Sequence, residues 1–351
     1  MEQKIPAVSV VIPMYNAEKF IGACLESIFA QNFKDFEVIV VDDCSTDNSV
    51  AVVENYLKGG QLKLLKSKKN FGNPCVPRNK GLNISRGKYI YFMDNDDLLI
   101  DNNAFEKFYN YAENYSVDVV CTHKYISFED APDKLQLENP KVIYSNTREI
   151  AETPLYASEN IAERINDLFQ GKIHVMPWLQ FSRRDFLVEN EIYFPEVLGG
   201  EDVLWIMHVI CEAKKILLIP DTLYATRTNP DSITRSPKTV EQKIKNKMFS
   251  IVDVKFMKAL FNKEKFFQEN PQYWYAWLNH LISYSFSVAF QDCANLNPYE
   301  VYKIFHEQFA QDFGENAELI SYLCSVINTQ QKQLYLANAK ISELEKRLSQ
   351  S

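Results

Sequence analysis

The sequence lacks features that would place it in several other classes of protein. It has no excess of positive charge, since 38 Lys and Arg stand against 46 Asp and Glu and the net charge is -8. Nucleic-acid-binding proteins usually present a broad basic face, so we expect no nucleic acid partner. The seven cysteines are odd in number and form no Cys-x-x-Cys pair. This pattern indicates reduced, mostly buried thiols rather than disulfides or a zinc site.

Long apolar runs and a secretory leader are also missing. No apolar run reaches the roughly 18 residues that a membrane-spanning helix needs. Residues 1–6 are short and charged and run straight into a predicted strand. We therefore expect a cytoplasmic protein that, where it meets a membrane, lies peripherally at the inner face. Trp274 and Trp277 share one stripe of a predicted helix over 273–290, which favours core packing over a membrane face.

The first half of the chain alternates two kinds of apolar pattern. Continuous apolar runs of strand length alternate with segments whose apolar residues recur at helical spacing. This alternation predicts an α/β fold, with a mostly parallel sheet and helices on both faces. The expected strands cover residues 7–13, 36–42, 62–66, 88–93 and 117–123. The expected helices cover residues 18–31, 49–58, 78–85, 103–114 and 203–211.

Changes in pattern along the chain predict three regions. Residues 1–237 should form the α/β domain, with a polar, irregular insertion at 124–173 that contains one helix near 159–170. Residues 238–318 read as helical, without a strand signal. Residues 319–351 carry a coiled-coil-like seam in alternating steps of four and three. We interpret this seam as a self-association helix, with a helix packed on its own subunit as the alternative. Its positions are Leu323, Ile327, Gln330, Leu334, Ala337, Ile341, Leu344 and Leu348.

A cluster of carboxylates follows the fourth predicted strand. Asp94, Asp96 and Asp97 stand within four residues, and like charges this close are costly without a cation. Mg²⁺ and Mn²⁺ prefer such oxygen ligands and usually bind one or two carboxylates together with substrate phosphates. A solvated acidic loop that caps the next helix is the alternative. We favour the metal site because ligands bind outside the carboxyl ends of the strands in such sheets.

Polar residues also follow the first two predicted strands. Tyr15 comes after the first strand and Asp43 after the second. An aspartate at such a position can accept a hydrogen bond from the N–H of uracil, and a tyrosine ring can stack on the base. Further along, Arg78 offers a cation that can meet a phosphate or a base.

Three segments in this order resemble glycosyltransferase family 2, the inverting nucleotide-sugar transferases of the GT-A fold. They are residues 8–16 (VSVVIPMYN), 41–47 (VDDCSTD) and 91–97 (YFMDNDD). Each segment alone has low specificity, but together they are specific, and the resemblance covers roughly residues 7–235. It implies a GT-A domain that is Rossmann-like in its alternation of strands and helices.

The resemblance also implies which residues bind the donor. Tyr15 and Asp43 would bind the base, and Arg78 would lie near base and phosphate. Pro13 and Asn95 belong to the same nucleotide-sugar-binding segments. UDP is the nucleotide that the family suggests.

The acidic cluster corresponds to the DxD pair of the family. Asp96 would be the direct ligand of Mn²⁺ or Mg²⁺, and Asp94 would point toward the ribose or the donor sugar. Residues 199–205 (GGEDVLW) resemble the segment that supplies the catalytic base, which would be Asp202. Glu201 is the alternative base and a candidate for acceptor binding, and a helix cap is the structural alternative for Asp202.

Two further residues are carried over from the family pattern. Arg227, followed by residues 231–234 (DSIT), resembles a closing segment that contacts the diphosphate, with a surface ion pair as the alternative. Trp178 lies where the family builds its acceptor wall, and it could stack on a sugar or belong to the core.

The sequence departs from the family pattern at two places. Pro74 and Pro77 stand where relatives usually carry small residues before the arginine, and they should stiffen that loop and alter the position of Arg78. Gln180 stands where relatives often have lysine.

We therefore predict a metal-dependent inverting glycosyltransferase. It would move a hexosyl or N-acetylhexosaminyl group from a UDP-sugar to a hydroxyl of a glycan or lipid-linked acceptor, in the synthesis of a bacterial surface polysaccharide, lipooligosaccharide or capsule. A sugar nucleotidyltransferase is one alternative, but it would need a glycine-rich loop where residues 13–16 read PMYN. A non-catalytic scaffold with a transferase-like domain is the other.

Overall fold

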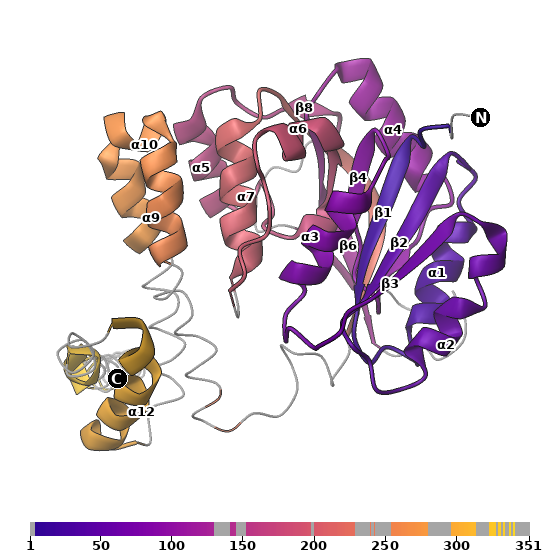
Figure 1. The fold of residues 1–351 in the computed structure, drawn as a ribbon. Helices are drawn as coiled ribbons and strands as arrows, with labels where there is room; N and C mark the ends of the chain where they lie inside the picture. Colours follow the sequence, from indigo (N-terminus) through magenta and orange to yellow (C-terminus); the bar gives the residue numbers. More distant parts are fainter. Residues whose placement is uncertain are drawn as a thin grey trace, which may run out of the picture. The chain divides into compact units, whose positions relative to one another are not determined.

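The fold is known from a computed structural model (Figure 1). It describes residues 4–129, 141–144, 152–197, 200–228, 239, 242, 254–279, 296–313, 323–327, 329–330, 333, 337 and 340. Contacts divide the chain into two compact units. Unit 1 comprises Met1–Arg235 and Lys263–Phe266, and unit 2 comprises Ser236–Asn262 and Phe267–Ser351. Within the described ranges, every helix is too short or too polar to cross a bilayer.

Unit 1 is built on a sheet of ten strands in the order β3-β2-β1-β4-β9-β6-β10-β5, with β7 paired to β6 and β8 to β10. The first four strands in this order are parallel, as the alternating pattern predicts. The strands are β1 (Val8–Met14), β2 (Phe36–Asp42), β3 (Leu62–Lys66), β4 (Tyr89–Phe92), β5 (Leu98–Leu99), β6 (Val119–Glu129), β7 (Lys141–Tyr144), β8 (Leu155–Tyr156), β9 (Gln180–Arg183) and β10 (Ile216–Thr228).

Beyond β4 the sheet is mixed rather than parallel. β9 runs antiparallel to both β4 and β6, while β10 runs parallel to β6 and antiparallel to β5. The prediction of an irregular insertion over 124–173 was wrong in part. β6 extends through the first residues of this stretch and pairs with β7, and β8 pairs with β10. The expected helix in the stretch is present as α5 (Ile161–Phe169).

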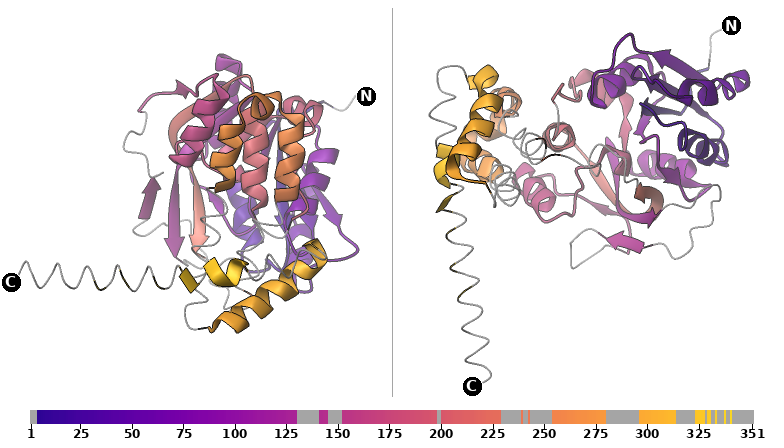
Figure 2. Two further views of the ribbon diagram at one scale, coloured as in Figure 1. Left: turned by 90° about the vertical axis from the view of Figure 1, so that its left-hand side faces the viewer. Right: turned by 90° about the horizontal axis from the view of Figure 1, so that it is seen from below.

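Helices cover both faces of the sheet, as Figures 1 and 2 show. The side chains of β1 alternate between the faces, so Val10 and Ile12 join the core with α1 while Val11 meets α3. The helices of unit 1 are α1 (Ile21–Phe29), α2 (Ser49–Glu54), α3 (Cys75–Ile84), α4 (Ala104–Tyr115), α5, α6 (Arg184–Glu189) and α7 (Glu201–Glu212), with short 3-10 helices η1 (Leu57–Gly59) and η2 (Pro177–Leu179).

The start of α3 differs from the sequence prediction. The helix begins at Cys75, three residues earlier than expected, and Pro77 occupies its first turn. A proline is tolerated there because the first amides of a helix have no partner within it. The two prolines therefore do not form a stiff loop before Arg78. They open a helix that already contains it.

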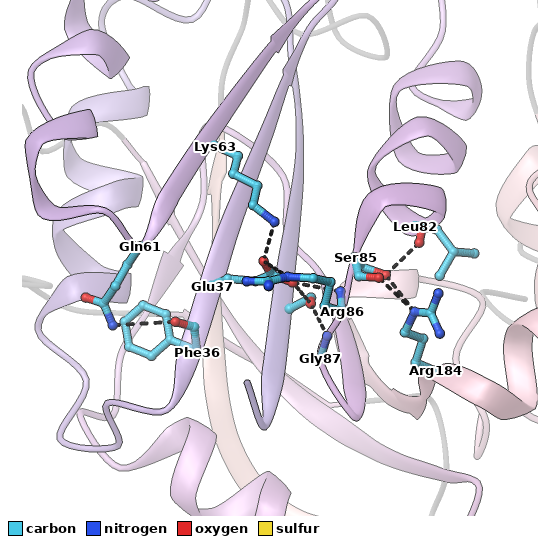
Figure 3. Close-up of polar contacts among 10 residues, drawn as sticks. Phe36, Glu37, Gln61, Lys63, Leu82, Ser85, Arg86, Gly87 and Arg184 are labelled. Atoms are coloured by element: carbon cyan, nitrogen blue, oxygen red, sulfur yellow. Dashed lines mark hydrogen bonds and ion pairs between the residues drawn. The ribbon is translucent and has the colours of Figure 1, made fainter. Parts of the chain in front are cut away.

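A salt-bridged network closes the amino-terminal ends of the strands (Figure 3). Glu37 of β2 is buried, and its carboxylate accepts hydrogen bonds from the Ser9 hydroxyl and the Arg86 amide, each at 2.7 Å. Lys63 of β3 forms an ion pair with it at 2.8 Å. The Gly87 amide donates to the Ser9 hydroxyl at 2.8 Å. This network satisfies the buried charge at the end of the sheet opposite the Asp-rich loops.

Unit 2 is helical in its described part, with α9 (Val254–Lys263), α10 (Lys265–Glu269) and α12 (Pro298–Phe313). The last residue of α9 and the first two residues of α10 are assigned to unit 1. Trp274 and Trp277 are buried in an aromatic cluster with Phe261 and Phe267. Their burial supports the interpretation of this stripe as core.

The predicted self-association seam is only partly described. Leu323 and Ile327 are exposed helical residues, and Gln330 and Ala337 are exposed as well. Leu334, Ile341, Leu344 and Leu348 lie outside the described residues, as do 231–234 and Gly199. The coiled coil and the boundary at 237 therefore stay predictions.

Candidate active site

The loops after β1 and β2 are fastened to each other. The Asp43 amide donates to the carbonyl of Met14 at 2.7 Å, and the Thr46 amide donates to Asn16 Oδ1 at 2.8 Å. Asn16 and Cys44 adopt positive φ angles of 46° and 66°. Left-handed backbone is costly for residues other than glycine, so the surrounding bonds must hold these loops in place. The loops are therefore rigid supports for the side chains beside them.

Tyr15 and Asp43, the two predicted base-binding residues, flank this junction. The Tyr15 ring is 44% exposed and is free to meet a ligand. Asp43 is buried, and its Oδ2 accepts a hydrogen bond from the Phe71 amide at 2.9 Å. Its Oδ1 is buried without a hydrogen-bond partner among the described residues. Burial raises the pKa of Asp43, against the lowering effect of the amides of Phe71 and Gly72. An orphaned carboxylate oxygen suits an N–H donor of a ligand.

The acidic residues after β4 form a tight turn. The Asp97 amide donates to the Asp94 carbonyl at 3.4 Å, and the Asn95 side chain donates to the carbonyl of Pro13 at 2.9 Å. Asn95 thus ties the turn to the end of β1. Asp94, Asn95 and Asp96 are partly exposed, while Asp97 is buried. Two of the three acidic residues of the turn, Asp94 and Asp96, are therefore partly accessible to solvent.

Arg78 joins the acidic turn to the start of α7. Its Nη2 lies 2.9 Å from Asp94 Oδ1, and its Nη1 lies 2.9 Å from Asp202 Oδ1 and 3.6 Å from Glu201 Oε1. The guanidinium is buried and its carbon lies 5.0 Å from the centre of the Phe194 ring. Residues from α3, the turn after β4 and α7 thus meet on one cation. The role of Arg78 toward a nucleotide stays a prediction.

Asp202 lies inside the first turn of α7. The helix begins at Glu201, one residue before Asp202 and two before the predicted start, and its N-cap is Gly200, whose φ is 78°. The capping position is therefore taken by another residue, and the carboxylate of Asp202 is left to Arg78. Burial raises the pKa of Asp202 to about 7, although Arg78 lowers it, while Glu201 and Asp94 raise it further. A carboxylate with this pKa can take up a proton near neutral pH.

Trp178 of η2 packs beside the acidic turn. It is buried, and its ring stacks on Tyr224 with centroids 4.5 Å apart and an interplanar angle of 12°. Tyr125 approaches it edge-on at 5.0 Å. Gln180 is also buried, and its side chain donates to the carbonyl of His174 at 3.1 Å. Where relatives often have lysine, this chain thus has an amide that fixes the loop carrying Trp178.

Arg227 near the end of β10 contacts the acidic turn through its backbone and its side chain. Its amide donates to Asp97 Oδ1 at 2.8 Å, and its Nε donates to the Asp96 carbonyl at 3.1 Å. The guanidinium lies over the rings of Phe20 and Phe128. It is buried, so a surface ion pair does not describe it.

Three residues that shape the site had no predicted role there. Asp97 was recognised as an acid but not as the buried member that holds the turn. Tyr224 belongs to the segment around Arg227, yet no pattern marks its hydroxyl. Phe194, under Arg78, follows α6 in an irregular stretch and carries no sequence signal.

Comparisons with known proteins show what the chain is similar to. Residues 9–183 match the description "Glycosyl transferase family 2". The chain is 29% identical over 255 residues to the poly(ribitol-phosphate) beta-N-acetylglucosaminyltransferase TarS of Staphylococcus aureus, covering 72% of this chain and 40% of that protein. It is 31% identical over 224 residues to a poly(ribitol-phosphate) beta-glucosyltransferase of Bacillus spizizenii, covering 62% and 31%.

The fold has the same relative among solved structures. The crystal structure of residues 1–349 of S. aureus TarS in complex with UDP-GlcNAc matches with a TM-score of 0.57 and 21% identity, covering 93% of this chain and 91% of that one. The chain spans about two fifths of the length of the first curated relatives it matches. The fold, the family match and the relatives together identify the chain as a glycosyltransferase of family 2, with a GT-A domain.

Proposed function

We propose that this chain is an inverting transferase that moves a sugar from a UDP-sugar to an acceptor hydroxyl, with Asp202 as the base. One observation carries the proposal. A single buried guanidinium, that of Arg78, contacts both a carboxylate of the DxD turn and Asp202, each at 2.9 Å. The group that would orient the donor and the group that would take the proton are therefore held together from distant parts of the chain.

The donor side supports a uridine nucleotide. Asp43 Oδ1 is buried and unpartnered, so it can accept the N–H of uracil, and the exposed Tyr15 ring can stack on the base. Asn95 fixes the acidic turn to Pro13 at 2.9 Å, which keeps the two loops at a constant separation. Arg227 lies beside the turn and would meet the diphosphate.

The carboxylates of the acidic turn fit a divalent cation. Asp94 is partly exposed and Asp96 stands two residues on, so both can present oxygen atoms outward. These hard ligands suit Mn²⁺ or Mg²⁺. When bound, the ion would neutralise the negative charge that develops on the departing diphosphate.

The chain's own groups account for the proton transfer. The acceptor hydroxyl attacks the anomeric carbon while the bond to the diphosphate breaks on the opposite face, which inverts the configuration. Asp202 would take the hydroxyl proton as the new bond forms, and its pKa near 7 suits this task. Arg78 keeps the carboxylate oriented and, as a buried and fixed cation, would stabilise the charge that develops beside it. Glu201, farther from Arg78 at 3.6 Å, is the alternative base or an acceptor contact.

The acceptor class follows from the relatives. Two of them are named for transfer to poly(ribitol-phosphate), one with N-acetylglucosamine and one with glucose. We propose a bacterial surface glycan of this kind, or a lipid-linked precursor of one, as the acceptor, and a hexosyl or N-acetylhexosaminyl group as the transferred sugar. Trp178, which stacks on Tyr224, would line the acceptor site. Peripheral contact with a membrane stays a prediction, which liposome flotation can test.

A thermal-shift panel tests the donor proposal. UDP and UDP-sugars with Mn²⁺ should raise the melting temperature by roughly 5–10 °C at a hundredfold excess over Kd, and ADP should not. Asp43→Asn should weaken the response to UDP, because an amide nitrogen would then compete for the position of the uracil N–H acceptor. No shift with any nucleotide would favour the non-catalytic scaffold, and release of diphosphate from a nucleoside triphosphate would favour a nucleotidyltransferase.

A further inference from the structure

Tyr224 of β10 places its hydroxyl between two residues of the acidic turn. The hydroxyl accepts a hydrogen bond from the Asp94 amide at 3.2 Å and donates one to Asp97 Oδ2 at 2.8 Å. The phenol is completely buried. A tyrosine hydroxyl has one proton and free lone pairs, so it can serve both partners at once. This hydroxyl thus fixes the backbone at the first residue of the DxD pair.

Asp97 fastens the same turn to β10 at a second point. Its Oδ1 accepts the Arg227 amide at 2.8 Å while its Oδ2 accepts the Tyr224 hydroxyl. β5, which follows the turn, pairs with β10 at Tyr224 and Ala225. The buried carboxyl group of Asp97 therefore bridges Tyr224 and Arg227 of β10, and the turn cannot shift without breaking these hydrogen bonds.

The ring of Tyr224 is held by Trp178 of η2. Trp178 stacks on it at 4.5 Å, and the Trp178 carbonyl accepts a hydrogen bond from the Tyr91 hydroxyl at 2.8 Å. A displacement of the Trp178 ring would thus move the Tyr224 ring and, with it, the hydroxyl that the Asp94 amide contacts.

We infer that Tyr224 is a positioning residue for the donor complex. It sets the backbone of Asp94, and thereby the direction of the carboxylates of Asp94 and Asp96, and it connects this turn to the aromatic wall at Trp178. Asp97 holds Tyr224 in place. The inference rests on the proposed function, because it assumes that Asp94 and Asp96 bind the metal ion of a UDP complex.

The test compares two variants that each remove one buried tyrosine hydroxyl. UDP binding is measured by calorimetry in the full chain, with and without Mn²⁺. Tyr224→Phe should weaken Mn²⁺-dependent UDP binding about tenfold, which corresponds to the loss of about one hydrogen bond, and leave metal-free UDP binding unchanged. Tyr89→Phe should leave both unchanged, because the buried Tyr89 lies at the start of β4 and its hydroxyl donates to Glu113 at 2.7 Å. Thermal unfolding should show a similar loss of stability in the two variants.

Equal effects of the two substitutions on Mn²⁺-dependent binding would overturn the inference. Asp97→Asn provides a second measurement where Tyr224→Phe does not fold, and it should weaken the same binding, because its amide can accept only one of the two hydrogen bonds. Unchanged Mn²⁺-dependent binding in Asp97→Asn would also count against the inference. Wild-type protein that binds UDP equally with and without Mn²⁺ would instead overturn the metal site itself, and the inference with it.

Discussion

Arg78 carries the electrostatics of the site at the scale of single residues. It is buried and faces three carboxylates, of which Asp94 and Asp202 lie at 2.9 Å and Glu201 at 3.6 Å. Burial is the largest cost of ionising Asp202, and three acids around one cation add a surplus of negative charge. This balance, rather than the aspartate alone, raises the pKa of Asp202 to about 7. A cation bound at Asp94 would lower the pKa of Asp202, because a nearby positive charge favours the ionised carboxylate.

The pH dependence of transfer should report this balance. With a pKa raised to about 7, Asp202 is protonated below that pH and cannot act as a base, so kcat/KM should rise with pH through about 7. Arg78→Gln removes the cation that lowers this pKa, so the rising limb should move to higher pH. The pH profile of kcat/KM checks both statements.

Arg184→Gln is the matched control for this profile. Arg184 is a partly buried arginine that donates to the Ser85 carbonyl at 2.9 Å, near the network of Figure 3. It should leave the position of the limb unchanged. If the rising limb of the kcat/KM profile has the same midpoint in Arg78→Gln as in the wild type, Asp202 is not the group that takes the proton.

The candidate site residues could be predicted individually from the sequence, but the contacts between them could not. Asp43 and Asp94 follow buried strands, and ligands are expected at such ends. The bond between Arg78 and Asp202 joins residues 124 positions apart, which no local pattern reveals. The role of Tyr224 could not be predicted for the same reason, because its hydroxyl bonds to residues about 130 positions earlier in the chain.

At the scale of elements, α3 determines where Arg78 lies. Its first turn contains Pro77, and Gly81 lies one turn further on, against β1. A Cβ atom at Gly81 would lie 2.3 Å from Cγ1 of Val11. The helix can approach the strand only because this residue has no side chain, and that approach brings Arg78 to the carboxyl end of the sheet.

Substitution of this glycine should destabilise the domain. Gly81→Ala forces either Val11 or the whole helix to move, and overpacking of this kind costs about 1–3 kcal/mol. Urea unfolding gives the change in the free energy of unfolding. Gly59→Ala is the control, since a Cβ there meets no atom within 4 Å and the change should be small. A Gly81→Ala variant as stable as Gly59→Ala would show that the helix does not need this contact.

Element prediction succeeded where the sequence pattern is continuous. β2 and β3 have the predicted bounds because each is an uninterrupted apolar or amphipathic run. β5 has two residues and β9 four, too few to show a period, and they run antiparallel within a sheet expected to be mostly parallel. α3 begins earlier than predicted, since a proline suits the first turn of a helix and does not mark a loop here.

On the scale of the whole GT-A unit, the two ends of the sheet have different roles. The amino-terminal ends are closed by Glu37 and Lys63. The carboxyl ends carry the strained loops, the acidic turn and Arg78. The α/β class could be predicted from the alternation of strands and helices, and the GT-A architecture from the resemblance to the family. The acceptor could not, because pocket shape depends on contacts between distant segments.

The activity of Asp202→Asn tests the central claim most directly. UDP release and sugar transfer to poly(ribitol-phosphate) are measured with the nucleotide sugar that gives the largest thermal shift, and UDP binding is measured by calorimetry. Asparagine can still accept a hydrogen bond from Arg78, so UDP binding should stay within about threefold while turnover falls about 10²–10⁴-fold. Glu201→Gln should retain more activity. Turnover above a tenth of the wild-type rate in Asp202→Asn would contradict the assignment of the base.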